Sequence, residues 1–180
     1  MKRFEHAARL DTANHPQPNK NKPVDNPFVR LRGMVNPSVE GKKYPVTAPY
    51  LVGREKMREF ANAVMSTSPV NHDVFAAQAA GYDDLIAPPT FAVVIQERSL
   101  ATVLADAEAD IDFSRVVHGD QRFIHARPIV AGDELTSELQ VASVKSLGAH
   151  SMVTFETKIH DASGDLVCTA ISTLVVRGDE

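Results

Sequence analysis

The sequence predicts an α+β fold in which a curved antiparallel sheet wraps around one long central helix. Residues 91–104 are apolar around most of a helical circumference, as expected of a buried helix. From Asp112 onward, apolar residues recur with a period of two, and turn residues interrupt them at hairpin spacing. A sheet with one apolar face must be covered, and the helix over 91–104 is the predicted element long and apolar enough to cover it. The same argument also permits other helix-on-sheet folds.

The predicted sheet consists of four strands joined by turns rich in Gly, Asp and Ser. We expect strands over residues 115–127, 134–145, 151–160 and 166–177. The alternation is clearest where Val153, Phe155 and Ile159 lie between polar residues. One face of the sheet should therefore be buried and the other solvated.

Shorter elements precede the long helix. Residues 44–51 contain two prolines and are typical of an extended segment at a sheet edge. Residues 52–64 follow a helical period, and their apolar face is formed by Met57, Phe60, Ala61 and Val64. A second short helix is predicted over residues 74–80, with Asp73 as its N-cap and Gly81 at its end. The loop of residues 66–73, which contains Pro69, connects the two helices.

Charge divides the chain into two parts. Residues 1–33 carry seven Lys/Arg and three Asp/Glu, which gives a net charge of +4. Residues 34–180 carry the remaining twelve Lys/Arg and twenty Asp/Glu, which gives −8, and the two parts add up to the overall charge of −4. A body of negative charge repels a phosphate backbone, so nucleic acid is not expected as a partner. The basic part is polar and proline-rich, and we interpret residues 1–36 as a flexible extension of one domain over residues 37–180.

Other features narrow the class of protein further. Cys168 is the single cysteine and lies in an apolar strand-like run, which predicts a buried thiol and excludes a disulfide framework or a Cys-rich zinc site. No apolar run approaches the roughly 18 residues needed to span a membrane. We therefore expect a cytoplasmic protein with no metal and no cofactor.

Two motifs carry a family resemblance. The first is the segment 66–91, with Gly81-Tyr82 and Ala87-Pro-Pro-Thr-Phe91. The second is Val117-His-Gly-Asp-Gln-Arg-Phe123, followed by Arg127-Pro-Ile-Val-Ala-Gly-Asp133. Over roughly residues 45–177 the chain resembles the MaoC-like hot-dog dehydratases and R-specific hydratases. The resemblance implies a hot-dog fold, a hot-dog homodimer or heterodimer, and a fatty acyl thioester of acyl carrier protein or coenzyme A as ligand.

The residues that carry the family's chemistry are replaced in this chain. The hydratase motif is Asp, any residue, Asn, Pro, an aliphatic residue and His, and aligning it on Pro69 places Ser66 at the Asp and Asn71 at the His. Neither Ser nor Asn has a pKa that suits general acid–base catalysis, which contributes about 100- to 10,000-fold. The pattern is similar to that of the non-catalytic subunit of heterodimeric (3R)-hydroxyacyl-acyl-carrier-protein dehydratases, which implies that another chain brings the catalytic pair.

Alternative roles remain open. A one-residue slip of the loop would pair His72 with Thr67, which makes His72 a candidate catalytic residue of a self-sufficient hydratase. Asp120 and His125 repeat the Asp–His spacing, but an odd separation in a strand puts them on opposite faces. A non-enzymatic homodimeric acyl-binding module is a further possibility, and a thioesterase is disfavoured because the loop lacks the expected carboxylate.

Candidate ligand-binding residues lie in the loop and at the start of the long helix. Ser66 and Asn71 can hydrogen-bond a thioester or a water molecule. Backbone N–H groups of Thr90 and Phe91, which follow Pro89, can polarise a thioester carbonyl, although a simple helix-capping turn explains the same residues. Arg122 and Arg127 can face the carrier, although ordinary sheet-surface charge also accounts for them.

Overall fold

The computed structural model describes residues 34–178, which belong to one compact unit, Leu31–Glu180. The predicted flexible extension lies outside the described residues up to position 33. Val35 and Asn36, which the sequence analysis assigns to the extension, are part of the folded unit: Val35 is buried in the core, and the Asn36 side chain caps the short 3-10 helix η1 (Pro37–Val39).

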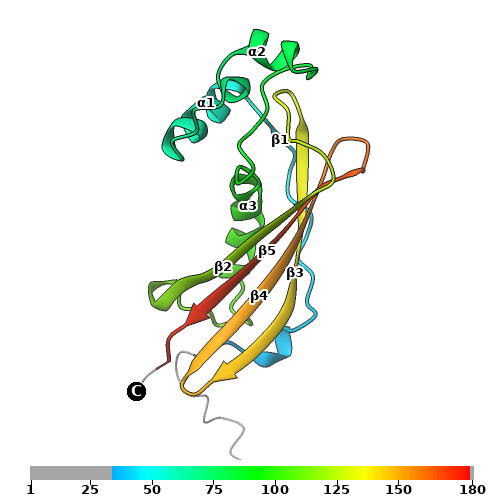
Figure 1. The fold of residues 1–180 in the computed structure, drawn as a ribbon. Helices are drawn as coiled ribbons and strands as arrows, with labels where there is room; N and C mark the ends of the chain where they lie inside the picture. The colour runs from blue at the N-terminus through cyan, green and yellow to red at the C-terminus, as the bar shows by residue number, and fades with distance from the viewer. Residues whose placement is uncertain (1–33, 179–180) are drawn as a thin grey trace, which may run out of the picture. The chain divides into compact units, whose positions relative to one another are not determined.

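A five-stranded antiparallel sheet forms the body of the fold (Figure 1). Its strands are β1 (Tyr50–Leu51), β2 (Val116–His125), β3 (Glu134–Leu147), β4 (His150–His160) and β5 (Leu166–Val176). They are ordered β1-β3-β4-β5-β2, so that β1 and β2 are the edge strands. The pairing shifts between His118 and Asp120 on β2 and between Val141 and Ser143 on β3. Such irregularities bend strands, which suits a sheet that curves.

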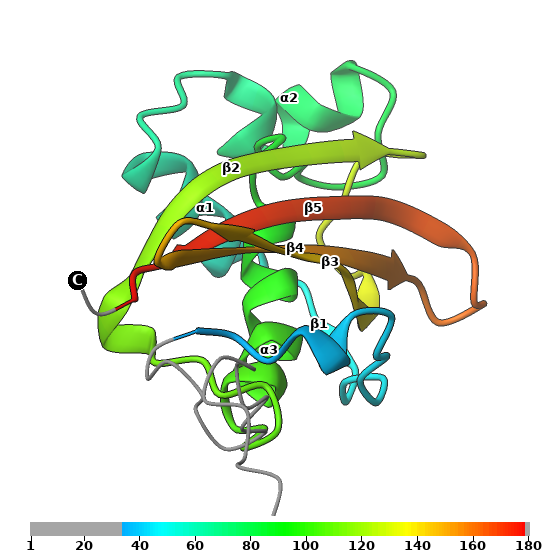
Figure 2. The same ribbon diagram turned by 90° about the horizontal axis from the view of Figure 1, so that it is seen from below.

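Helix α3 (Ala92–Leu104) packs against one face of this sheet (Figure 2). The prediction of a long buried helix over residues 91–104 is confirmed to within one residue, and Ile95, Leu100 and Val103 are among its buried side chains. The four predicted strands are also confirmed within two residues at each end. The inferred arrangement of a curved antiparallel sheet around a central helix is therefore observed.

The core consists of two apolar clusters with polar side chains between them. On β3, Ser137 lies between Leu135 of one cluster and Leu139 of the other. On β4, Thr157 separates Phe155 from Ile159 in the same way. Gln96, Ser137, Thr157 and Ser172 are all buried. A layer of polar residues thus crosses the interior at mid-height of the helix.

Hydrogen bonds connect part of this layer. The Gln96 amide donates to Ser172 Oγ at 3.1 Å, and Gln121 on the edge strand β2 donates to Gln96 Oε1 at 3.0 Å. Within the described residues, Gln121 Oε1 and Thr157 Oγ1 are buried without a hydrogen-bond partner. Because an unpaired buried polar atom costs free energy, these two atoms weaken the core locally.

Two short helices, α1 (Arg54–Ala63) and α2 (Val74–Ala79), lie at one end of the unit (Figure 1). Met57 and Ala61 of α1 are buried as predicted. The prediction for Val64 is wrong: α1 ends at Ala63, and Val64 is 42% exposed. Val64 is the C-cap, and the next residue, Met65, has a positive φ of 55°, so the chain leaves the helical path at the position where Val64 would complete the apolar face. In the described part of the chain, no helix is long and apolar enough to cross a membrane.

Candidate functional site

The loop of residues 66–73 is held close to the end of α1. The Ser66 N–H donates to Ala61 O at 2.8 Å, which fixes the start of the loop on the last turn of the helix. The 3-10 helix η2 (Pro69–Asn71) then reverses the chain, with Pro69 at a position that suits its fixed φ. The loop therefore forms a hydrogen-bonded connection between α1 and α2.

Ser66 and Asn71 bond to each other. Ser66 Oγ donates to Asn71 Oδ1 at 2.7 Å, and Asn71 Nδ2 donates to Ile86 O at 2.7 Å. Asn71 is only 5% exposed, and the Ile86 N–H donates to Val70 O at 3.0 Å. These bonds attach the loop to the segment that precedes α3. The side chains of Ser66 and Asn71, at the positions that the resemblance aligns with the catalytic Asp and His, thus help to hold the backbone in place.

His72 also contributes to the loop structure. Its Nε2 donates to Ser66 O at 2.8 Å, because a carbonyl oxygen can only accept, and its own carbonyl accepts from Arg58 Nε at 2.9 Å. The ring is half-buried and directed at its own loop, whereas Thr67, its partner in the slipped register, is exposed. The proposed catalytic role of His72 remains a prediction that this contact does not favour.

Asp73 begins α2, as predicted. Its Oδ1 accepts hydrogen bonds from the N–H groups of Phe75 and Ala76, at 2.7 and 3.2 Å. A second contact ties α1 to the segment after α2, since Arg54 Nη2 lies 2.6 Å from Asp84 Oδ2. The Arg54 guanidinium lowers the pKa of the Asp84 carboxyl. Both carboxylates therefore have structural partners.

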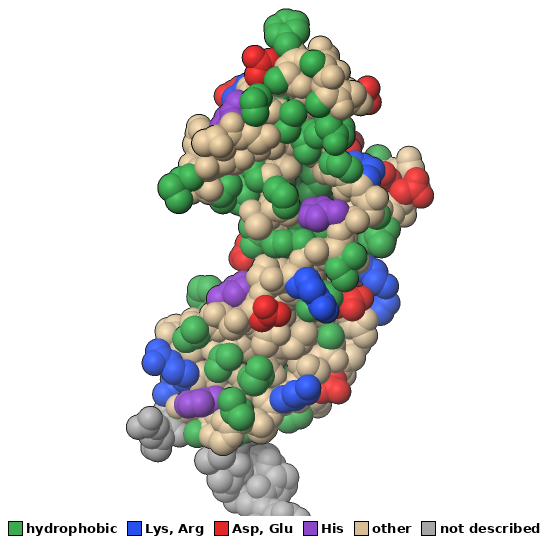
Figure 3. Space-filling view, in the orientation of Figure 1, with side chains coloured by type: hydrophobic (Ala, Val, Ile, Leu, Met, Phe, Trp, Pro, Cys, Tyr) green, Lys and Arg blue, Asp and Glu red, His purple; other side chains and the backbone are tan. Residues whose placement is uncertain are grey.

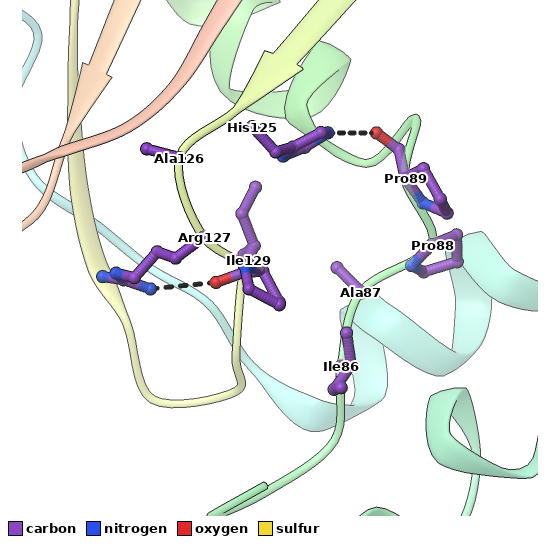
Figure 4. Close-up of a pocket in the computed structure, with 9 residues that line it drawn as sticks. Ile86, Ala87, Pro88, Pro89, His125, Ala126, Arg127 and Ile129 are labelled. Atoms are coloured by element: carbon purple, nitrogen blue, oxygen red, sulfur yellow. Dashed lines mark hydrogen bonds between the residues drawn. The ribbon is translucent and has the colours of Figure 1, made fainter.

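A pocket of about 320 Å³ opens between the segment before α3 and the end of β2 (Figure 4). Its lining residues are Ile86, Ala87, Pro88, Pro89, His125, Ala126, Arg127, Pro128 and Ile129. The volume lies within the range of small-molecule sites, and most of the wall is aliphatic. In the space-filling view, a notch bordered by hydrophobic side chains separates the α1–α2 end from the body (Figure 3). The pocket suits an apolar chain.

Arg127 stabilises one wall of the pocket without facing into it (Figure 4). Its Nη1 lies 2.8 Å from Asp133 Oδ2, and its Nη2 lies 3.0 Å from Asp161 Oδ2. The hydrogen bond that Arg127 donates to Asp133 is the main cause of a raised pKa at Arg127, and the guanidinium in turn lowers the pKa of Asp161. Arg127 is thus paired with two carboxylates, while Arg122 lies exposed on β2, which leaves a carrier contact at Arg122 as a prediction.

The predicted ligand-binding residues at the helix start lie in different environments. Pro89 lines the pocket, and Thr90 is exposed. Phe91 is fully buried and packs edge-on against Phe60, with ring centroids 5.3 Å apart. Its N–H donates to Pro88 O at 2.9 Å, so this group is already used in the turn. Of the two N–H groups suggested for carbonyl binding, that of Phe91 is therefore engaged within the chain.

Two further expectations concern reactive groups. Cys168 is a free, buried thiol, and burial raises its pKa to about 11, which makes it unreactive at neutral pH. Asp120 pairs with Thr173 and His125 with Cys168 in an uninterrupted register, so the two side chains lie on opposite faces, as predicted. Among the described residues, no cluster of His, Cys, Asp or Glu has the arrangement of a metal site.

Sequence reasoning missed His125 as a pocket residue. In the sequence, His125 stands out only through its spacing from Asp120. The alternation that excluded that pair also places His125 on the same face as Phe123, which packs against the core. The side chain therefore points toward the start of α3, where Nε2 lies 2.8 Å from Pro89 O.

The fold and the pocket define the class as the hot-dog fold of the MaoC-like dehydratases. The chain belongs to the family described as "FAS1-like, dehydratase domain region", whose model matches residues 38–170. A UPF0336 protein of Leifsonia xyli subsp. xyli is 65% identical over 146 residues, which cover 81% of this chain and 98% of that protein. A UPF0336 protein of Streptomyces avermitilis is 48% identical over 143 residues, which cover 79% of this chain and 95% of that protein.

Solved structures agree with this assignment. The C-terminally truncated HadBC (3R-hydroxyacyl-ACP dehydratase) complex of Mycobacterium tuberculosis contains a chain that is 32% identical, with a TM-score of 0.65. The match covers 81% of this chain and 97% of that chain. A MaoC-like dehydratase is 31% identical with a TM-score of 0.70, and the match covers 78% of this chain but 42% of that longer chain. The predicted family and fold are confirmed.

Proposed function

We propose that this chain is the acyl-thioester-binding, non-catalytic subunit of a (3R)-hydroxyacyl thioester dehydratase in fatty-acid elongation. The observation that carries the proposal is the Ser66–Asn71 hydrogen bond of 2.7 Å, between the two residues that the resemblance aligns with the catalytic Asp and His. Addition or removal of water next to a thioester carbonyl needs an acid and a base, and this pair supplies neither. The neighbouring pocket keeps the shape and apolar character of a ligand site. The acyl carrier is acyl carrier protein or coenzyme A.

The proposal includes a second hot-dog chain that brings the Asp–His pair. Support comes from the 32% identity to a chain of the HadBC complex, which contains two different subunits by its name. Within residues 34–178, the edge strand β2 pairs only with β5, and its Val117 and Ile124 side chains are exposed. An unpaired strand edge with apolar side chains is suited to pairing with another chain. We place the partner at this edge.

A reconstitution experiment tests this function. The purified chain is assayed for hydration of a short enoyl thioester, alone and after co-expression with a dyad-bearing hot-dog chain from the same cell. We expect negligible turnover alone and activity in the complex. Substantial turnover by the chain alone, abolished in His72→Ala, would instead support a self-sufficient hydratase. A stable homodimer that binds acyl thioesters and fails to pair would support a non-enzymatic binding module.

A further inference from the structure

His125 occupies a position between two separate parts of the chain. It is the last residue of β2, and its ring reaches across to the residues that precede α3 (Figure 4). Nε2 lies 2.8 Å from Pro89 O. The pocket lies beside this contact, with Ala87 and Ile129 on its wall. The ring thus forms part of the pocket boundary.

The contact with Pro89 fixes the chemical character of the ring. A backbone carbonyl only accepts hydrogen bonds, so Nε2 must carry the proton. In a neutral imidazole the other nitrogen then has no proton and acts as an acceptor. His125 therefore offers Nδ1 as a hydrogen-bond acceptor at the edge of an otherwise apolar pocket.

The other lining groups restrict what the pocket can bind. The Arg127 guanidinium is engaged by Asp133 and Asp161 and is directed away from the pocket (Figure 4). The Ala87 N–H donates to Ile129 O at 2.9 Å, so this backbone pair is satisfied. A phosphate or carboxylate would lack a cationic partner among these lining residues. The pocket therefore suits an uncharged chain.

We propose that His125 is a ligand-binding residue of this pocket and accepts a hydrogen bond from an N–H or O–H group of a neutral chain. The inference rests on the proposed function, because a 3-hydroxyacyl thioester supplies both kinds of donor. The pantetheine arm carries amide N–H groups, and the acyl part carries a hydroxyl at C3. Both sources share the same chemistry, and the two can be separated by experiment.

Equilibrium binding to the complex with the partner subunit tests this inference, with the partner's catalytic pair disabled so that no turnover occurs. The probes are 3-hydroxybutyryl-CoA, butyryl-CoA and free pantetheine. In His125→Phe, loss of one hydrogen bond should weaken binding roughly tenfold. If the donor is the hydroxyl, only 3-hydroxybutyryl-CoA is affected. If the donor is the amide, both esters and pantetheine are weakened equally.

Two variants complete the design. His125→Gln retains an N–H for Pro89 and an oxygen acceptor, so it should bind within about threefold of the wild type, and it keeps the test valid if His125→Phe does not fold. His160→Phe, the same exchange outside this pocket, should leave binding unchanged. Wild-type affinity of His125→Phe for both esters would overturn the inference. A wild-type complex that binds neither ester would overturn the proposed function itself.

Discussion

The Ser66 hydroxyl donates a 2.7 Å hydrogen bond to the Asn71 amide oxygen, across the two positions that the resemblance assigns to a catalytic Asp and His. The backbone brings these two side chains together, and neither side chain can act as a general acid or base. We expect the double variant Ser66→Asp with Asn71→His to hydrate enoyl thioesters at least about 100-fold above the unmodified chain, because general acid–base catalysis contributes this much.

Loss of the enoyl absorbance in a steady-state assay measures this gain. Ser66→Asp alone is the control, since it provides a carboxylate without a histidine. A folded double variant that is no faster than Ser66→Asp would show that the loop no longer presents these positions to a substrate.

A second prediction concerns the structural role of Asn71. Its side chain is buried and bonds both Ser66 and Ile86, so Asn71→Ala removes two hydrogen bonds and leaves the Ile86 carbonyl without this donor. We expect a loss of about 1–3 kcal/mol in the free energy of unfolding, measured by urea denaturation. Ser68→Ala is the matched control, because Ser68 makes no side-chain capping bond and is exposed. Equal stability of the two variants would show that the hydrogen bonds of the Asn71 side chain do not stabilise the fold.

The sequence predicts the elements well and the contacts between them less well. Alternation and helical periodicity locate α3 and the four long strands because burial of one face imposes the pattern directly. The exposure of Val64 depends on the backbone turn at Met65, which periodicity does not report. The pocket joins Pro89 to His125, 36 positions apart, so its formation depends on the tertiary packing of β2 against the start of α3.

The polar layer in the core gives a pair of opposite predictions. Gln96→Leu leaves Ser172 Oγ and Gln121 Nε2 without their shared partner and should cost about 1–3 kcal/mol of stability. Thr157→Val replaces a buried hydroxyl that has no partner within the described residues, and it should be neutral or stabilise by up to about 1 kcal/mol. Urea titrations measure the free energy of unfolding of the two variants. Strong destabilisation of Thr157→Val would mean that the Thr157 hydroxyl is hydrogen-bonded in the wild-type protein in solution.

Stability at low pH depends on Asp106. Hydrogen bonds from Lys42 Nζ, at 2.7 Å, and Tyr44 OH, at 2.8 Å, lower the pKa of Asp106 to about 2. An unfolded Asp has a pKa of about 3.9, so the contact stabilises the fold above about pH 4 and is lost as the pH falls toward about 2. Asp106→Asn should therefore be less stable than the wild type at neutral pH, with a difference that narrows over this window.

Urea midpoints measured across the acid range check this dependence. Asp83→Asn, on an exposed part of the loop before α3, is the control and should follow the wild type. A constant difference between Asp106→Asn and the wild type from neutral pH to about pH 2 would exclude the ionised carboxylate as the cause.

The proposal that this chain binds the acyl thioester while a partner chain supplies the catalytic pair is tested most directly by mixing the two chains. The hydration rate of a short enoyl thioester is measured while the chain is titrated into a fixed amount of the dyad-bearing partner. We predict negligible activity for the chain alone and a rate that rises to a plateau at one chain per partner. Full activity of the chain in the absence of a partner, or a partner whose rate does not respond to the chain, would contradict the proposal.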